Sequence, residues 1–216
     1  KVPLLDNFQL DLIHLEDQID ANTKIIWICS PNNPTGNSIN RIDIETVLNN
    51  FTGIVVIDEA YINFAQQKSF VQELADYPNL VVMQTFSKAW GLAGLRLGMA
   101  FASLSIIEIM NKVKPPYNIN QATQELVLTA LEEIGQVNDM IKLLVDMRIA
   151  LADVFLSMPT VERVYPSDAN FILVGGIANP AEIWQKLLDQ GILVRDVGIP
   201  NTLRITAGTE TETTAV

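Results

Sequence analysis

The hydrophobic residues of the first half of the chain fall into short, uninterrupted runs separated by polar segments. Four runs, rich in β-branched residues or bounded by turn-forming residues, predict buried strands at residues 25–29, 54–58, 80–86 and 97–103. Between and after these strands, apolar residues with helical spacing predict helices at 41–50, 69–77, 105–113 and 120–133. Apolar strands that alternate with helices indicate an α/β fold, with a mostly parallel sheet covered on both faces.

The second half of the chain begins with a long helical pattern from 137 to 158. Its inward-facing positions are expected to be Met140, Leu143, Leu144, Met147, Leu151, Val154 and Phe155. Strands are predicted within 161–174, 191–197 and 202–208, and a helix at 180–191, with Pro180 at its start and Gly191 at its end. The polar stretch "TETETTAV" that follows is expected to be unstructured. We therefore expect a large domain at 1–136, and a linking helix with a smaller α+β domain at 137–216.

Composition narrows the classes of function. Hydrophobic residues make up 49% of the 216 residues, which is enough for a sizeable core. The net charge of −11 argues against nucleic acid as a partner. No apolar run approaches the roughly 20 residues of a membrane span. The single cysteine, Cys29, excludes an intrachain disulfide and fits a reducing, cytoplasmic location. Because the chain opens on Lys1 without an initiator Met, we expect a fragment.

One lysine has an unusual position. In "TFSKAWGLAGLRLG", Lys88 follows a predicted buried strand and lies in a loop of small residues. Position alone favours a solvated surface lysine. Several companions at the ends of neighbouring predicted strands change this interpretation: Asp58, Tyr61, Asn33, Ser87 and Arg96. Such strand ends are where parallel sheets bind their ligands.

Asp58 alone could cap a helix, bind a metal or pair with a cation. A metal site is poorly supported, because the only histidine, His14, is far away in sequence and no Cys/His spacing accompanies it. A dinucleotide site is not supported either, because "GLAGLRLG" does not form G-x-G-x-x-G between a first strand and its helix. Together, however, these residue types match the needs of pyridoxal 5'-phosphate.

Each residue type meets one need of that cofactor. A lysine amine can attach to its aldehyde carbon. A carboxylate beside the pyridine nitrogen keeps the ring protonated, so that it can accept electrons. Hydroxyl and amide donors stabilise the negative charge of the phenolic oxygen, and serine and arginine bind the phosphate. The set therefore points to covalent catalysis on an amino-group substrate.

The same residues carry a family resemblance. "SPNNPTG", "DEAY" and "SKAWGLAGLRLG", in this order, resemble the large domain of the fold-type-I pyridoxal-phosphate aminotransferases. "VKPPYNINQ", "YPSDANFILV", "GILVRDVG" and "LRITAGT" are most similar to the histidinol-phosphate aminotransferases. The resemblance runs from about Trp27 to Thr209. It implies the fold-type-I architecture, a homodimer in the full-length protein, and amino transfer between L-histidinol phosphate and 2-oxoglutarate, yielding glutamate, in histidine biosynthesis.

Roles for individual residues follow from this resemblance. It implies that Lys88 attaches the cofactor and moves the substrate proton, and that Asp58 pairs with the ring nitrogen. Asn33 and Tyr61 would contact the phenolic oxygen, and Ala60 would pack against the ring face. Without the resemblance, Asn33 could simply be a residue of a turn, where Asn is common, and Tyr61 could be a core residue with a satisfied hydroxyl.

The resemblance also implies which residues bind the anionic groups of the cofactor and of the substrate. The resemblance implies that Ser87 and Arg96 bind the cofactor phosphate. Arg204 would hold the anionic end of the substrate, with Arg195 as a second arginine nearby; Arg204 could instead be a structural salt-bridge partner. The family's N-terminal part, with its stacking aromatic residue and the tyrosine donated across the dimer, has no counterpart here. The alternatives are an aromatic or other amino-acid aminotransferase, a threonine-phosphate decarboxylase, and a non-catalytic fragment.

Overall fold

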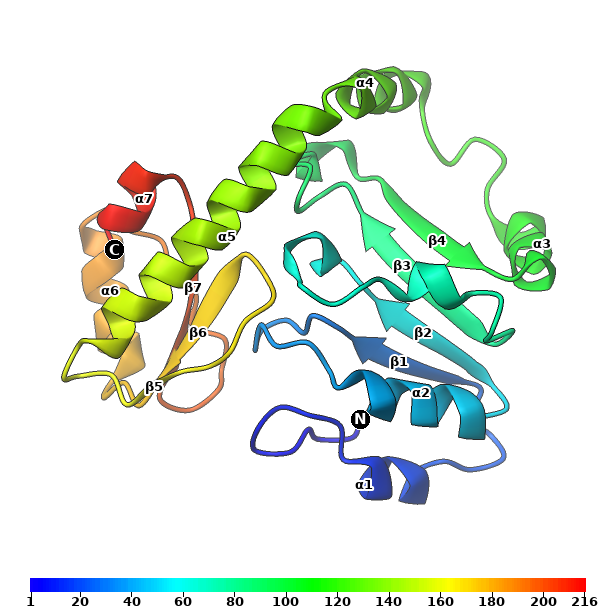
Figure 1. Ribbon diagram of the computed structural model, residues 1–216, viewed down its shortest axis with the longest axis horizontal. Coiled ribbons are helices and arrows are strands. Elements are labelled where there is room, and N and C mark those ends of the chain that lie inside the picture. Colours follow the sequence, from blue (N-terminus) through cyan, green and yellow to red (C-terminus); the bar gives the residue numbers. More distant parts are fainter. The chain divides into compact units, whose positions relative to one another are not determined.

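The computed structural model describes all residues from 1 to 216, and the chain forms two compact units (Figure 1). Unit 1 comprises residues 1–30, 39–63 and 67–137. Unit 2 comprises residues 138–216 together with two short loop segments, 31–38 and 64–66. These units describe compactness only, so the expected division into functional domains at 1–136 and 137–216 remains a prediction.

Unit 1 is built on a four-stranded sheet in the order β1-β2-β3-β4. Its strands are β1 (Ile25–Cys29), β2 (Ile54–Asp58), β3 (Leu80–Thr85) and β4 (Gly98–Ala102). The first three are parallel, and β4 runs antiparallel to β3. Cys29 lies opposite Asp58, and Asp58 opposite Met83, so the carboxyl ends of the three parallel strands are in register. This confirms the predicted mixed, mostly parallel sheet.

The sheet of unit 1 is accompanied by four helices and three short 3₁₀ turns. The helices are α1 (Leu12–Asp17), α2 (Arg41–Asn50), α3 (Leu104–Val113) and α4 (Gln121–Glu132). The 3₁₀ turns are η1 (Ile62–Phe64), η2 (Phe70–Glu73) and η3 (Ala93–Leu95). The helix predicted at 69–77 is wrong in type and length, since only η2 forms there. Pro78 follows closely, and a residue before proline is disfavoured in helical backbone, which limits extension.

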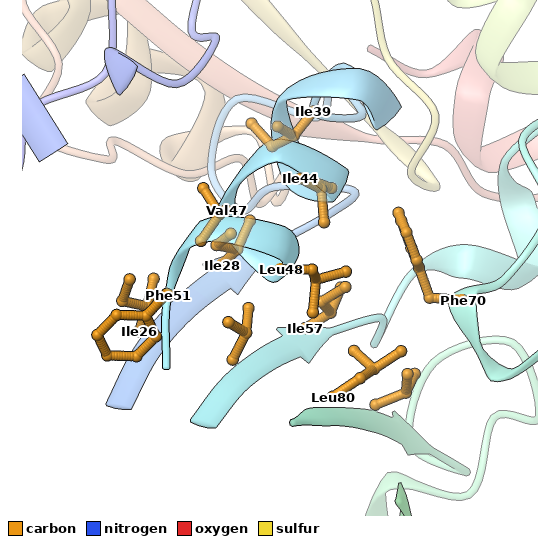
Figure 2. Close-up of a cluster of buried hydrophobic side chains, with 12 residues drawn as sticks. Ile26, Ile28, Ile39, Ile44, Val47, Leu48, Phe51, Ile57, Phe70 and Leu80 are labelled. Carbon is orange, nitrogen blue, oxygen red and sulfur yellow. The ribbon is translucent and has the colours of Figure 1, made fainter. Parts of the chain in front are cut away.

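The core of unit 1 lies between α2 and one face of the sheet (Figure 2). Ile26 and Ile28 of β1 point into this cluster, where they meet Ile44, Val47 and Leu48 of α2. The alternate residues of β1, Ile25 and Trp27, are 57% and 55% exposed. The expectation that both faces are covered is therefore wrong for β1, because α1 and α2 both pack on the Ile26 side.

Unit 2 is built on a three-stranded antiparallel sheet in the order β5-β6-β7. Its strands are β5 (Arg163–Val164), β6 (Phe171–Gly175) and β7 (Thr202–Thr206), and its helices include α6 (Pro180–Asp189) and α7 (Glu210–Thr214). The long helix α5 (Ile134–Leu156) contributes most of its length to this unit. Leu151 and Phe155 of α5 are buried with Ile172, Val174 and Leu203 of the sheet.

Three expectations for this part of the chain are wrong in detail. Met140, Leu143 and Val154 of α5 were expected to face inward but are 48%, 43% and 53% exposed. Only residues on one side of the helix near its end, such as Leu151 and Phe155, pack in the core cluster of unit 2. The stretch 191–197 forms no strand, only a single bridge at Arg195. The polar tail forms α7, stabilised by a capping box in which Thr209 and Glu212 bind each other's backbone N–H groups.

A buried arginine stabilises unit 2 from within. Arg148 of α5 is 6% exposed, and its Nη1 donates to the carbonyl oxygens of Ala169 at 2.8 Å and Phe64 at 3.5 Å. Burial lowers the pKa of Arg148, while the nearby charge of Asp168 raises it. A single side chain thus joins a helix, the 64–66 loop and the turn before β6.

We expect Arg148→Met to lower the free energy of unfolding by about 1–3 kcal/mol, because two buried carbonyl groups lose their donor. Urea denaturation of the chain measures this. The matched control is Arg163→Met, at an exposed arginine whose guanidinium carbon lies 5.6 Å from the ring of Tyr165. Equal midpoints for both variants would contradict a stabilising role for Arg148.

None of the helices combines the length and the apolar character needed to cross a membrane.

Candidate functional site

Asp58 and Tyr61 lie together where β2 ends. Asp58 is the last residue of the strand, and its Oδ1 accepts the backbone N–H of Ala60 at 3.0 Å, which fixes the turn that follows. Tyr61, at the end of this turn, is only 6% exposed. The β-branched run "IVVI" forms the strand up to Asp58, and the strand ends there because the Asp58 carboxylate accepts a hydrogen bond from the following turn.

Lys88 follows the end of the neighbouring strand, β3. Its Nζ lies 5.3 Å from the centre of the Tyr61 ring, within the range of a cation–π contact. The Lys88 side chain is exposed, so its amine is accessible. The parallel register of β2 and β3 therefore brings Lys88 and Tyr61 together at one edge of the sheet, where Asp58 ends its strand, as the sequence predicts.

Ser87 and Arg96 lie at the two sides of one loop. The loop is closed at its neck by the N–H of Phe86, which donates to the carbonyl of Leu97 at 3.2 Å. Thr85 Oγ1 donates to Ser87 Oγ at 2.9 Å and accepts the Ser87 N–H at 3.0 Å. Arg96 has a left-handed backbone with φ of 53°, and its Nη1 donates to the carbonyl oxygen of Ala93 at 3.1 Å. Ser87 and Arg96 are therefore the first and last residues of the loop that the Phe86–Leu97 hydrogen bond closes.

The remaining predicted residues form a second group, in unit 2. Asn33 Oδ1 accepts a hydrogen bond from Arg204 Nη1 at 2.6 Å, and the guanidinium carbon of Arg204 lies 4.8 Å from the centre of the Phe171 ring. Arg195 and Arg204 exchange two backbone hydrogen bonds, of 3.0 and 2.8 Å. Because the Asn33 oxygen binds the arginine, its NH₂ group is the part of the amide suited to donate to a ligand.

The cysteine of β1 is a poor nucleophile. Burial raises the pKa of the Cys29 thiol, and the negative charge of Asp58 on the neighbouring strand raises it further. A raised pKa keeps the thiol protonated, and the thiolate is the reactive form. This disfavours a nucleophilic role for Cys29.

Sequence reasoning missed three residues that lie beside predicted site residues. Thr85 holds Ser87, and the hydroxyl pair in "TFS" was the available signal. Phe171 underlies Arg204, and no local signal in the sequence joins these two residues. Glu59 lies inside "DEAY" but is 1% exposed, so that its carboxylate belongs to the core.

Other features of the structure do not compete with this site. No group of three or more His, Cys, Asp and Glu side chains is placed to hold a metal ion. A cavity of about 550 Å³ between α1 and α2 is lined by residues such as Leu12, Glu16 and Phe51, and contains none of the predicted site residues.

The whole chain, residues 1–216, matches the family described as aminotransferase class I and II, and it therefore belongs to that family. A curated relative, the histidinol-phosphate aminotransferase of Cytophaga hutchinsonii, is 46% identical over 215 residues. The match covers 98% of this chain and 62% of the relative. The chain thus spans less than two thirds of the length of that relative.

Solved structures show the same fold. The histidinol-phosphate aminotransferase of Clostridium acetobutylicum matches with a TM-score of 0.88 at 24% identity, over 98% of this chain and 66% of that one. The histidinol-phosphate aminotransferase of Sinorhizobium meliloti, solved in complex with pyridoxal 5'-phosphate, matches with a TM-score of 0.85 at 23% identity, over 100% and 61%. These likenesses establish the fold-type-I architecture.

Proposed function

We propose that this chain carries cofactor- and substrate-binding residues of an aminotransferase that uses pyridoxal 5'-phosphate and moves an amino group between L-histidinol phosphate and 2-oxoglutarate. The observation that carries the proposal is the placement of the Lys88 amine beside Tyr61, next to the strand that Asp58 ends. Family membership and the name of the Cytophaga relative support it. The proposal includes glutamate as the amino-group partner of 2-oxoglutarate, a homodimer of the full-length protein and a cytoplasmic location.

The donor set of unit 1 fits pyridoxal 5'-phosphate. The cofactor needs an amine for its aldehyde, a carboxylate for its ring nitrogen, and hydroxyl and cationic donors for its phosphate. Lys88 and Asp58 meet the first two needs, and Ser87 and Arg96 flank one loop neck in positions suited to the third. Ala60, which has a short side chain and lies in the turn after Asp58, would pack against the ring face. In a chain of net charge −11, these local donors are what would attract a phosphate.

Each side chain has a definite task in the proposed reaction. When bound, pyridoxal 5'-phosphate supplies a ring that withdraws electrons from the substrate. The Lys88 amine holds the cofactor and then moves the proton of the substrate Cα. Asp58 keeps a proton on the ring nitrogen by pairing with it. The Tyr61 hydroxyl would donate to the phenolic oxygen and stabilise its charge. The family resemblance gives the Asn33 NH₂ group the same task.

Arg204 and Arg195 are proposed to bind the anionic end of the substrate. Two arginines on bridged backbone positions suit a phosphate, which accepts several charge-assisted hydrogen bonds, and they also suit a carboxylate of 2-oxoglutarate. Arg204 has the better defined position, because Asn33 and Phe171 hold its side chain. Arg195 is exposed and is placed by its backbone bridge.

Substrate profiling tests the proposed function. We expect kcat/KM for L-histidinol phosphate, with 2-oxoglutarate as acceptor, to exceed that for phenylalanine and tyrosine by at least about tenfold, because only the phosphorylated substrate uses both arginines fully. Equal or higher values for the free aromatic amino acids would contradict the assignment of substrate. Release of CO₂ from threonine phosphate would instead identify a decarboxylase.

A further inference from the structure

Glu59 stands between two residues of the candidate site but is buried in the core of unit 1. We propose that Glu59 is a positioning residue: its carboxylate ties the end of β2, which carries Asp58 and Tyr61, to the end of β3, which leads to Lys88. This inference rests on the proposed function, because it concerns the same site. Glu59 itself has no place among the groups that would touch the cofactor.

The Glu59 carboxylate accepts three hydrogen bonds, with at least one on each oxygen. Oε1 accepts the backbone N–H of Phe70 at 2.8 Å. Oε2 accepts the hydroxyl of Ser69 at 2.5 Å and the side-chain amide of Gln84 at 2.8 Å. With 1% of the residue exposed, protein groups replace water around both oxygens. The side chain thus joins β2 to the η2 segment and to β3 at once.

The bond to Gln84 is the one that concerns the site. Gln84 lies on β3, one residue after Met83, which is opposite Asp58 in the sheet. The backbone of Glu59 also binds β3, because its N–H donates to the carbonyl of Met83 at 2.8 Å. Main chain and side chain of one residue therefore both hold the two strand ends together. The Ile62 N–H donates to the Glu59 carbonyl at 3.1 Å, which closes the turn that contains Tyr61.

The Glu59 side chain accepts all three of its hydrogen bonds. Burial raises the pKa of Glu59 overall, and its three hydrogen bonds and the charge of Arg41 on α2 offset this rise only in part. Arg41 lies 4.0 Å above the Phe70 ring and also pairs with Glu45 and Glu73. A backbone N–H and an amide NH₂ can only donate, so each carboxylate oxygen faces at least one group that requires an acceptor.

Glu59→Gln is the informative substitution, because glutamine keeps the shape of the side chain but has one accepting oxygen and one donating NH₂ group. That NH₂ group would face donors, so at least one of the three bonds is lost. The matched control is Glu73→Gln, which changes a nearby carboxylate that pairs with Arg41 and lies outside both strand ends. A purely structural role for Glu59 would lower stability without altering the site.

The first measurement needs no cofactor. Hydrogen exchange, followed by mass spectrometry of the full chain, reports how firmly the amides of residues 58–62 are held. In Glu59→Gln we expect their exchange to be faster by about tenfold, while β1 and α2 keep the protection of the unsubstituted chain. Unchanged protection at 58–62, or an equal loss throughout unit 1, would overturn the proposal.

The second measurement uses pyridoxal 5'-phosphate as the probe. We expect Glu59→Gln to weaken its binding by about tenfold and to displace the pH midpoint of its visible absorption band, because Asp58 and Tyr61 shift relative to Lys88. Glu73→Gln should leave both values unchanged. If the unsubstituted chain binds the cofactor and Glu59→Gln binds it equally well, with the same midpoint, the positioning role is overturned.

The proposed function can fail separately. If neither the unsubstituted chain nor Lys88→Ala binds the cofactor, the assignment of the site is contradicted, while the hydrogen exchange still decides whether Glu59 positions the strand ends. Should Glu59→Gln fail to fold, Gln84→Met removes the tie to β3, together with the bond from Gln84 to the Ser69 hydroxyl, and leaves the bonds of Glu59 to Ser69 and Phe70. It should produce smaller changes in the same direction, and no change at 58–62 would overturn the proposal.

Discussion

Replacing Lys88 with alanine is expected to lower the rate of amino transfer by at least about a thousandfold, because the variant lacks the amine that holds the cofactor and carries the substrate proton. The rest of the site should stay in place, since Lys88 is exposed and its removal leaves no buried group unpaired. The rate of a single turnover, measured with the cofactor present in excess, separates this chemical effect from weaker binding of the cofactor.

A covalent label provides an independent readout. Borohydride reduction should fix pyridoxal 5'-phosphate to the unsubstituted chain and not to Lys88→Ala. The control is Lys112→Ala, at an exposed lysine near the end of α3, which should retain both the label and the rate. A label that persists in Lys88→Ala would mean that another lysine reacts, and the assignment of Lys88 would be wrong.

Much of the fold of unit 1 was predictable from local patterns. The strands at 25–29 and 54–58 match the prediction residue for residue, because β-branched runs bounded by turn-forming residues leave little choice of structure. The prediction of a strand failed at 191–197, where the segment does not form a ladder with a neighbouring strand. "GILVRDV" resembles a strand, but only Arg195 within it bridges to β7, so no ladder forms. Strand propensity is expressed only where a neighbouring edge accepts the hydrogen bonds.

The site was predictable in part for a related reason. The sequence places Lys88 and Tyr61 just after two strands, and because β2 and β3 pair in parallel, the residues that follow them lie close together. The hydrogen bond between Asn33 and Arg204 joins residues 171 positions apart, and no periodicity encodes such a contact. The core role of Glu59 was hidden for the opposite reason, because its acidic side chain resembles a site residue until its burial is known.

Arg204 provides the second large expected effect. We expect Arg204→Lys to lower kcat/KM for L-histidinol phosphate by about a hundredfold. The planar guanidinium group of arginine can bind an anion and stack on an aromatic ring at the same time, and a lysine ammonium group cannot. In the chain, that fork spans the Asn33 oxygen, at 2.6 Å, and the Phe171 ring, at 4.8 Å. Most of the loss should appear in KM, since an arginine that holds the remote end of the substrate binds the ground state and the transition state alike.

The comparison with Arg195→Lys decides which arginine is dominant. Arg195 is exposed and is positioned through its backbone, so a lysine there keeps the charge near the same place, and we expect a loss below about tenfold. Arg163→Lys, on β5, should leave the kinetics unchanged. A larger loss in Arg195→Lys than in Arg204→Lys would reverse the assignment, and would mean that the contacts with Asn33 and Phe171 hold Arg204 as a structural residue. An equal, large loss in both would show that the anion is shared between the two guanidinium groups, as their paired backbones allow.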